Sequence, residues 1–201
     1  VDKAITISST LTDKNTTSAI PNANIDYYLI TGWLWQKINS SLTGANGVST
    51  IKYTPTNVSR SGEPFAIGAL YLGTEKYGGS SDTKFLTVNP LATNISLSLP
   101  TAARVGAKFT ATITLKDENQ NPLSNSTVTY LVNWGEGWIK IRDLTTSAAG
   151  SASIDYTPTK AGELEIKAEY GGDSKHTSSS EETTLTVSKV KTTLTLSMPT
   201  T

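Results

Sequence analysis

The chain has 201 residues, of which 17% are charged and 36% are hydrophobic, and its formal net charge at pH 7 is zero. This balance excludes a disordered polyelectrolyte, and without a basic cluster the chain offers no surface for nucleic acid or an anionic membrane. No stretch approaches the roughly 20 apolar residues of a membrane span. The chain has no cysteine and therefore no disulfide, which suits a prokaryotic surface protein.

Two parts of the sequence repeat each other at a spacing of about 100 residues, a common length for one domain. Tyr-Thr-Pro-Thr at 53–56 recurs at 156–159, and Leu-Thr-Val at 86–88 recurs at 185–187. The spacing is too long for a solenoid repeat. The sequence therefore predicts two tandem domains.

The first copy, residues 1–89, begins without a first strand. Val1 corresponds to about Val105 of the second copy, whose own first strand lies well ahead of that position. The first domain is therefore expected to start at its second strand. Because the chain begins with Val1 rather than Met, we interpret it as a mature extracellular protein whose signal peptide has been removed.

The second copy, residues 90–189, shows the period-2 alternation of β-strands, interrupted by turn signals rich in Gly, Pro, Asn and Asp. The predicted strands are 95–99, 109–117, 127–133, 138–143, 151–156, 163–170 and 183–187. This number of short strands in about 100 residues indicates a two-sheet immunoglobulin-like (Ig-like) sandwich, with Trp134 or Trp138 expected to fill its core. The predicted fold class is all-β, with two tandem Ig-like β-sandwiches.

The last segment, residues 190–201, repeats the first strand of the second copy. Residues 193–199 match residues 94–100 position for position. In both cases the connection from the preceding Leu-Thr-Val, here called the lead-in, has the same length. Alternation places three apolar side chains of this segment on one face. They are Leu194, Leu196 and Met198. The segment is thus predicted to be a first strand without a domain of its own.

By β-strand addition, a free strand can complete a sandwich that lacks one strand, and the sandwich in turn buries the apolar face of that strand. An open sheet edge recruits other chains, and the lead-in is too short for the strand to return across the second domain to the first. The expected partners are therefore identical subunits, joined head to tail into a filament. Leu194, Leu196 and Met198 are the predicted donor-strand residues.

Five Asn-x-Ser/Thr sequons are spread along the chain. They lie at Asn15, Asn39, Asn57, Asn94 and Asn125. Their spread favours a glycosylated exterior, although a composition rich in Asn, Ser and Thr produces some sequons by chance. N-linked glycans are expected, and no cofactor is.

The second copy carries Tyr-Thr-Pro-Thr-x-Ala-Gly at 156–162, Ala-x-Tyr-Gly-Gly-Asp at 168–173 and Thr-Leu-Thr-Val at 184–187. This pattern resembles the Ig-like repeats of bacterial and archaeal surface proteins. Together with the sequons, the lack of cysteine and the C-terminal strand, it makes the chain similar to the subunit of the archaeal thread, a glycosylated, pilin-like surface filament assembled by donor-strand complementation. The resemblance implies an extracellular structural or adhesive role.

Two alternative interpretations remain open. The chain could be a fragment of a longer tandem Ig-like cell-surface array, with both ends arbitrary. It could also be a carbohydrate-binding surface adhesin, because tryptophans such as Trp33 and Trp134 offer flat faces for sugars. Trp35 and Trp138 align between the copies, which favours a shared core or interface position. Surface or glycan receptors are the partners of the adhesin interpretation.

The sequence predicts no enzyme. It contains no phosphate-binding Gly-rich loop, nucleophile elbow or His/Cys cluster at metal-ligand spacing. The single histidine, His176, aligns with Tyr77 and is expected to fill a ring-sized position in a loop. Asp117 and Asp173 are carboxylates that calcium could use, but Asx turns explain them better. No catalytic residue and no metal ligand are therefore predicted.

Overall fold

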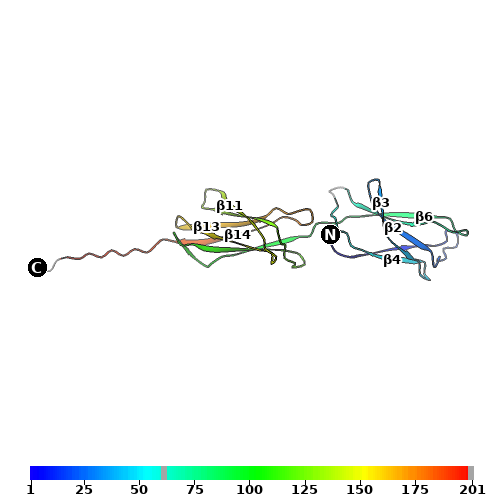
Figure 1. Ribbon diagram of the computed structural model, residues 1–201, viewed down its shortest axis with the longest axis horizontal. Coiled ribbons are helices and arrows are strands. Elements are labelled where there is room, and N and C mark those ends of the chain that lie inside the picture. Colours follow the sequence, from blue (N-terminus) through cyan, green and yellow to red (C-terminus); the bar gives the residue numbers. More distant parts are fainter. Residues whose placement is uncertain (60–62, 199–201) are drawn as a thin grey trace. The chain divides into compact units, whose positions relative to one another are not determined.

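The computed structural model describes residues 1–59 and 63–198 and is all-β over that part of the chain, with no helix there (Figure 1). Among the same residues, none forms a helix long and apolar enough to cross a membrane. The chain divides into two compact units, unit 1 (Val1–Pro90) and unit 2 (Leu91–Thr201). The segment predicted as a separate donor strand, 190–201, is part of unit 2 in this division.

Unit 1 forms two antiparallel sheets from the strands that the structure describes. These are β1 (Ile5–Thr10), β2 (Asn24–Thr31), β3 (Leu34–Leu42), β4 (Val48–Tyr53), β5 (Phe65–Tyr71) and β6 (Ser80–Leu86). One sheet holds β1 and β4, and the other has the order β3-β2-β5-β6. The core between them is built on Ile25, Tyr27, Ile51 and Tyr71, all buried.

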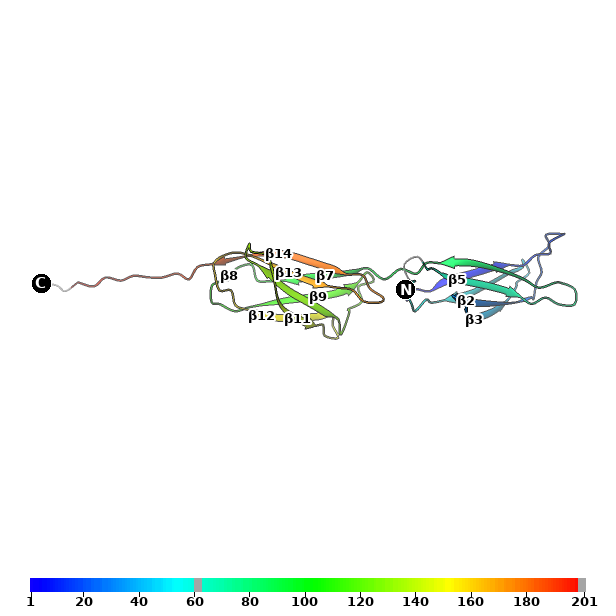
Figure 2. The same cartoon turned by 90° about the horizontal axis from the view of Figure 1, so that it is seen from above.

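Unit 2 has the same plan with one more strand in each sheet. Its strands are β7 (Thr93–Ser98), β8 (Ala103–Arg104), β9 (Phe109–Asp117), β10 (Thr127–Asn133), β11 (Trp138–Thr145), β12 (Ser151–Tyr156), β13 (Gly162–Tyr170) and β14 (Ser179–Ser188). The sheets have the orders β12-β9-β7 and β11-β10-β13-β14-β8 (Figure 2). The all-β, Ig-like sandwich class expected from the alternation is confirmed. The short strand β8, parallel to β14, was not predicted because two residues show no alternation.

Tyr130, and not a tryptophan, is the largest side chain buried at the centre of unit 2. Val132 faces the core, so the next residue, Asn133, and its cross-strand partner Trp138 face outward. The Trp138 side chain is accordingly 38% exposed, and the prediction that it fills the core is wrong. Trp134 is half-buried and packs at the margin of the core, with the Lys160 ammonium 5.5 Å from its ring centroid.

A buried threonine hydroxyl fixes the same corner in both units. The Thr43 hydroxyl donates to the carbonyl of Ile20 at 2.7 Å and accepts from the amide of Ala23 at 2.9 Å. In unit 2 the Thr146 hydroxyl makes the same two bonds, to Leu123 at 2.6 Å and from Ser126 at 2.9 Å. The repeat in the sequence is therefore a repeat of local structure.

The central tyrosine differs between the units in what its hydroxyl meets. In unit 1 the Tyr27 hydroxyl donates to the Ser49 carbonyl at 3.0 Å and lies 2.8 Å from the Ser9 hydroxyl. In unit 2 the position of Ser9 is taken by Ile113, and the buried Tyr130 hydroxyl has no hydrogen-bond partner among the described residues. Burial also raises the pKa of Tyr130.

These two tyrosines provide a matched test. We expect Tyr27→Phe to lower the free energy of unfolding of unit 1 by about 1 kcal/mol, because a satisfied hydroxyl is lost. Tyr130→Phe removes a buried hydroxyl that lacks a partner and should leave unit 2 as stable or more stable. Hydrogen exchange measured by NMR reports the two units separately. Equal destabilisation by the two substitutions would contradict this account.

Candidate functional site

The outer edge of β1 is open at a place where unit 2 is closed. In unit 2, β9 pairs with β12 on one side and with β7 on the other. In unit 1, β1 holds the position of β9 and, within the described residues, its strand pairing is with β4 alone. The equivalence is set by matching backbone bonds, from Asp2 to Pro55 at 2.7 Å and from Gly106 to Pro158 at 2.9 Å. Over residues 1–59 and 63–90, unit 1 thus shows no counterpart of β7.

A groove occupies this place in unit 1. It has a volume of about 390 Å³ and runs between β1 and the β6 residues Asp82, Lys84, Phe85 and Leu86, over Tyr27, Ile67 and Ala69. A smaller space of about 120 Å³ continues it past Leu11 and Tyr71. The groove therefore lies between the two sheets, on the side where β7 closes unit 2.

Burial shows what β7 contributes in unit 2. Ile95 on β7 is 4% exposed, and Leu97 and Leu99 pack against the core. Leu185 on β14 is consequently 2% exposed, whereas the equivalent Leu86 of unit 1 is only half-buried. Unit 1 therefore keeps an apolar groove of the kind that β7 covers in unit 2.

Charged side chains line the β6 wall of the groove. Asp82 and Lys84 are paired in register with Ala69 and Ile67, so they alternate toward the same face as Leu86. Their carboxylate and ammonium lie 3.4 Å apart, and both side chains are exposed. Charges that point inward at a sheet edge disfavour unselective pairing with other strands.

The predicted donor residues are exposed and unpaired in this structure. Residues 189–198 form no strand, and the side chains of Leu194, Leu196 and Met198 are 97%, 85% and 77% exposed (Figure 1). Residues 199–201, the end of the predicted donor strand, lie outside the described residues. The five sequon asparagines are all exposed.

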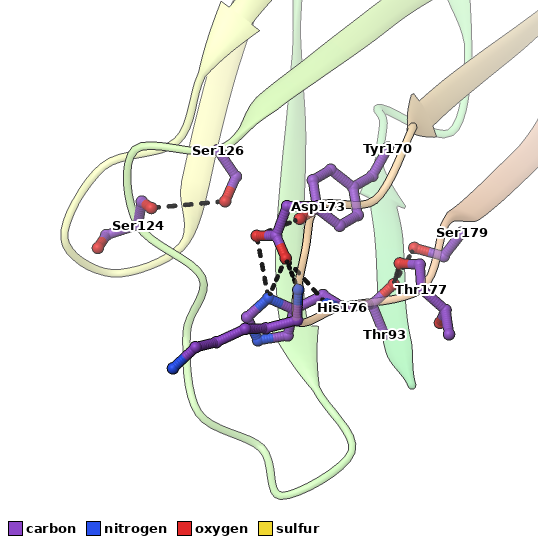
Figure 3. Close-up of polar contacts among 9 residues, drawn as sticks. Thr93, Ser124, Ser126, Tyr170, Asp173, His176, Thr177 and Ser179 are labelled. Atoms are coloured by element: carbon purple, nitrogen blue, oxygen red, sulfur yellow. Dashed lines mark hydrogen bonds and ion pairs between the residues drawn. The ribbon is translucent and has the colours of Figure 1, made fainter. Parts of the chain in front are cut away.

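The loop between β13 and β14 fixes the start of β7 in unit 2, which sequence reasoning missed (Figure 3). The Thr93 hydroxyl donates to the Thr177 carbonyl at 2.9 Å and to the Ser179 hydroxyl at 2.8 Å. Just before it, the Leu91 amide donates to the Lys175 carbonyl at 2.8 Å, and the Leu91 carbonyl accepts from Thr177 at 2.9 Å. This loop therefore holds the lead-in of the first strand.

Asp173 gives this loop its shape (Figure 3). Its carboxylate accepts from the amides of Lys175 and His176 at 2.7 and 2.8 Å and lies 2.9 Å from the His176 ring nitrogen. Partial burial by itself raises the pKa of Asp173, but these donors and the Tyr170 hydroxyl outweigh it and lower the pKa to about 2. In this structure the Asp173 carboxylate thus uses its hydrogen bonds to shape the turn.

Unit 1 has the same loop with a threonine in the place of Asp173. The Thr74 hydroxyl accepts from the Tyr77 amide at 3.2 Å, and the Thr74 amide donates to the Tyr77 carbonyl at 2.8 Å. Tyr77 thus holds the position of His176, as the alignment suggested. The loop that holds the start of β7 in unit 2 therefore has a structural counterpart in unit 1.

Asp117, the other carboxylate that calcium could use, likewise shapes a turn. The Asp117 carboxylate accepts from the amides of Asn119 and Asn121, both at 2.8 Å, and from the Asn121 side chain at 2.9 Å. Over residues 1–59 and 63–198, no group of three or more His, Asp or Glu side chains is arranged to hold a metal ion. The polar chemistry of these loops is that of turns.

The Asp173 carboxyl supplies a pH prediction. Because its folded pKa is about 2, below the ordinary 3.8, its stabilising contribution is present above pH 3.8 and is lost as the pH falls toward 2. We expect carboxyl NMR to give a midpoint near 2 for Asp173. The substitution His176→Asn removes one donor and should raise that midpoint toward 3.8. An ordinary midpoint in the unchanged chain would show that the loop is formed differently.

Comparisons with known proteins agree with this fold. Residues 96–188, less than half of the chain and all within unit 2, match the family model described as bacterial Ig-like domain (group 3). The comparison with curated proteins found no match. Among solved structures the chain is similar to invasin, a bacterial integrin-binding protein, with 20% identity and a TM-score of 0.50, over 93% of this chain and 36% of that one.

The chain is also similar to a tetra-tandem repeat in the extending region of a large adhesion protein. The identity is 16% and the TM-score 0.45, over 92% of this chain and 49% of that one. The chain thus spans about a third of invasin and about half of the repeat structure. At this identity the likeness to invasin shows the fold alone.

Proposed function

We propose that the chain is a non-enzymatic, structural component of an extracellular or cell-surface filament. In this proposal, residues 193–198 of one copy enter the unit 1 groove of the next copy, so that copies join head to tail. The observation that carries it is the open groove along β1, at the place that β7 fills in unit 2. An exposed segment that repeats the pattern of β7 is available to fill it.

The segment supplies what the groove lacks. Leu194, Leu196 and Met198 would take the positions that Ile95, Leu97 and Leu99 hold in unit 2. Burying three such side chains at about 1.5–3 kcal/mol each contributes roughly 5–9 kcal/mol. Backbone bonds to β1 add about 0.5–1.5 kcal/mol apiece, less the cost of ordering the strand. Exchange requires local unfolding, so the joint would be kinetically stable without a covalent bond.

The residues just before the segment would also have a binding partner in unit 1. Val190 and Thr192 precede the segment as Leu91 and Thr93 precede the apolar residues of β7. By analogy with unit 2, Val190 would pair with the backbone at Tyr77, which holds the position of His176. A strand that enters unit 1 would thus be positioned at its start as well as along its length.

The second candidate is a tandem Ig-like array or adhesin, which the family match and the similar solved structures favour. In that arrangement the strand in the unit 1 groove comes from a neighbouring part of the same long protein, and residues 193–198 begin a further domain. Both candidates make the groove a strand acceptor. They differ in whether the strand belongs to another copy.

Substitutions in the segment separate the two candidates. We expect the purified 201-residue chain to form multimers by light scattering and fibres by negative-stain microscopy. Leu196→Asp should give monomers, because a carboxylate in a dry groove costs several kcal/mol, roughly 2–7 for a polar group and more for a charge. Thr195→Asp is the matched control, since its side chain faces outward and should be tolerated.

Deletion of residues 191–201 should also give monomers. A monomeric unchanged chain would favour the tandem array, and fibres from the truncated chain would contradict the filament. If Leu196→Asp and Thr195→Asp behave alike, the register of the inserted strand is wrong.

We also propose that the five exposed sequons carry N-linked glycans, in keeping with the proposed surface location. Asn94 lies on β7 beside the buried Ile95, so alternation turns its side chain to solvent. Mass spectrometry of native material should find glycans at Asn15, Asn57, Asn94 and Asn125 at least. Unmodified asparagines at these sites would refute the glycan proposal and leave the filament proposal unaffected.

A further inference from the structure

The outer face of the four-stranded sheet in unit 1 carries a row of apolar side chains across all four strands. Trp35 on β3 is paired with Ile30 on β2, Ile30 with Ala66 on β5, and Ala66 with Phe85 on β6. Paired residues of an antiparallel sheet share a face. Trp35 and Phe85, at the two ends, are 54% and 79% exposed. We call these four residues the aromatic row.

The neighbouring row keeps the centre of this face flat. Tyr28 is paired with Gly68, and its ring meets the ring of Trp35 edge-on, with 5.8 Å between centroids and 61° between planes. A Cβ added at Gly68 would lie 3.1 Å from Ile30 Cδ1 and 3.5 Å from Trp35 Cζ3. Glycine at this position therefore lets Trp35 and Ile30 pack over the sheet.

Unit 2 shows that the fold does not require this row. Ile30 and Ala66 correspond to Asn133 and Glu165, which hydrogen-bond to each other at 2.7 Å. Gly68 corresponds to Lys167, whose ammonium lies 2.6 Å from Glu169 and 3.0 Å from Glu182. The same ammonium is 5.4 Å from the centroid of the Trp138 ring.

The outer face of unit 2 is therefore covered by polar pairs, and that of unit 1 is not. The apolar character belongs to unit 1 and has no role in closing its sandwich. It is a property of the surface.

We propose that the aromatic row binds a neutral oligosaccharide, with the rings of Trp35 and Phe85 against the C–H faces of its sugar rings. Aromatic rings present a large rigid surface with a π-face that suits such contacts. Polar groups for the sugar hydroxyls lie beside the row. The Tyr28 hydroxyl is one, and the Lys37 ammonium, 2.7 Å from the Asp26 carboxylate, supplies a donor next to an acceptor.

The size and charge of the face favour a sugar over another protein. Three strand spacings of about 4.8 Å make the row about 14 Å long, the length of a short oligosaccharide. A stable protein interface needs about 800 Å² from each partner, far more than four side chains provide. Lys37 neutralises Asp26 and holds the pKa of that carboxyl below its ordinary value, so this polar margin carries no net charge for an ionic ligand.

This site is separate from the groove, although Phe85 also borders it. The variants that test it are therefore placed at Trp35 and Gly68. Trp35→Ala removes one ring. Gly68→Lys introduces the residue that unit 2 has at this position and displaces Ile30 and Trp35 at the centre of the row, because a Cβ there would lie 3.1 Å from Ile30 Cδ1. Trp138→Ala in unit 2 is the matched control, because its ring already contacts Lys167.

The experiment is calorimetric titration of the whole chain with three neutral hexasaccharides, cellohexaose, N-acetylchitohexaose and mannohexaose. We expect saturable binding of at least one, weakened about tenfold or more by Trp35→Ala and by Gly68→Lys, and unchanged by Trp138→Ala. Leu196→Asp should bind as the unchanged chain does, so failure of the filament and failure of the sugar site are distinguishable.

Three results would overturn the proposal. The first is no binding of any of the three sugars at millimolar concentration. The second is binding that the row variants leave unchanged and Trp33→Ala abolishes, which would place the site at the β2–β3 turn. The third is self-association that Trp35→Ala abolishes, which would make a second copy the occupant of the row.

Discussion

The pairing of β7 with β9 is the interaction on which the organisation of this molecule depends. It supplies backbone partners to one edge of β9 and places Ile95 over the core, where Ile113 and Leu115 of β9 and Leu185 of β14 are buried. In the part of unit 1 that the structure describes, β1 has no such pairing, and its inward residues are only half-buried. An added strand would both pair the open backbone edge and cover the apolar groove.

The two units share two local geometries and differ on their outer sheet faces. The threonines at 43 and 146 hold the same corner with the same two hydrogen bonds, and the loops at Thr74 and Asp173 make the same turn. On the outer sheet face, by contrast, ion pairs in unit 2 stand where glycine and apolar residues stand in unit 1. These outer-face differences lie on strands that pair in the same order in both units, so the shared fold does not require them.

Much of unit 2 could be predicted from the sequence because alternation fixes both the strand and its buried face. The expected strands at 109–117, 127–133 and 151–156 have the same limits in the structure. Trp138 was misplaced because size suggested a core residue, whereas the alternation that begins at Val132 turns its position outward.

The open groove could be inferred from the phase of the repeat, since one copy starts a strand later than the other. Its charged wall and the aromatic row could not. Both depend on which residues of separate strands lie opposite each other, and that register cannot be derived from the sequence alone.

The groove of unit 1 combines an apolar floor with an ionised wall, and this combination determines which strands it can accept. A polar strand would leave the floor uncovered, and a continuous apolar strand would expose every second apolar side chain to solvent. An alternating strand places its apolar side chains on the floor and leaves its Thr and Ser side chains on the outside. Under either proposal, a strand from another copy or from the same long protein would meet the same selectivity. An open edge with this selectivity would act as a binding site rather than as an aggregation hazard.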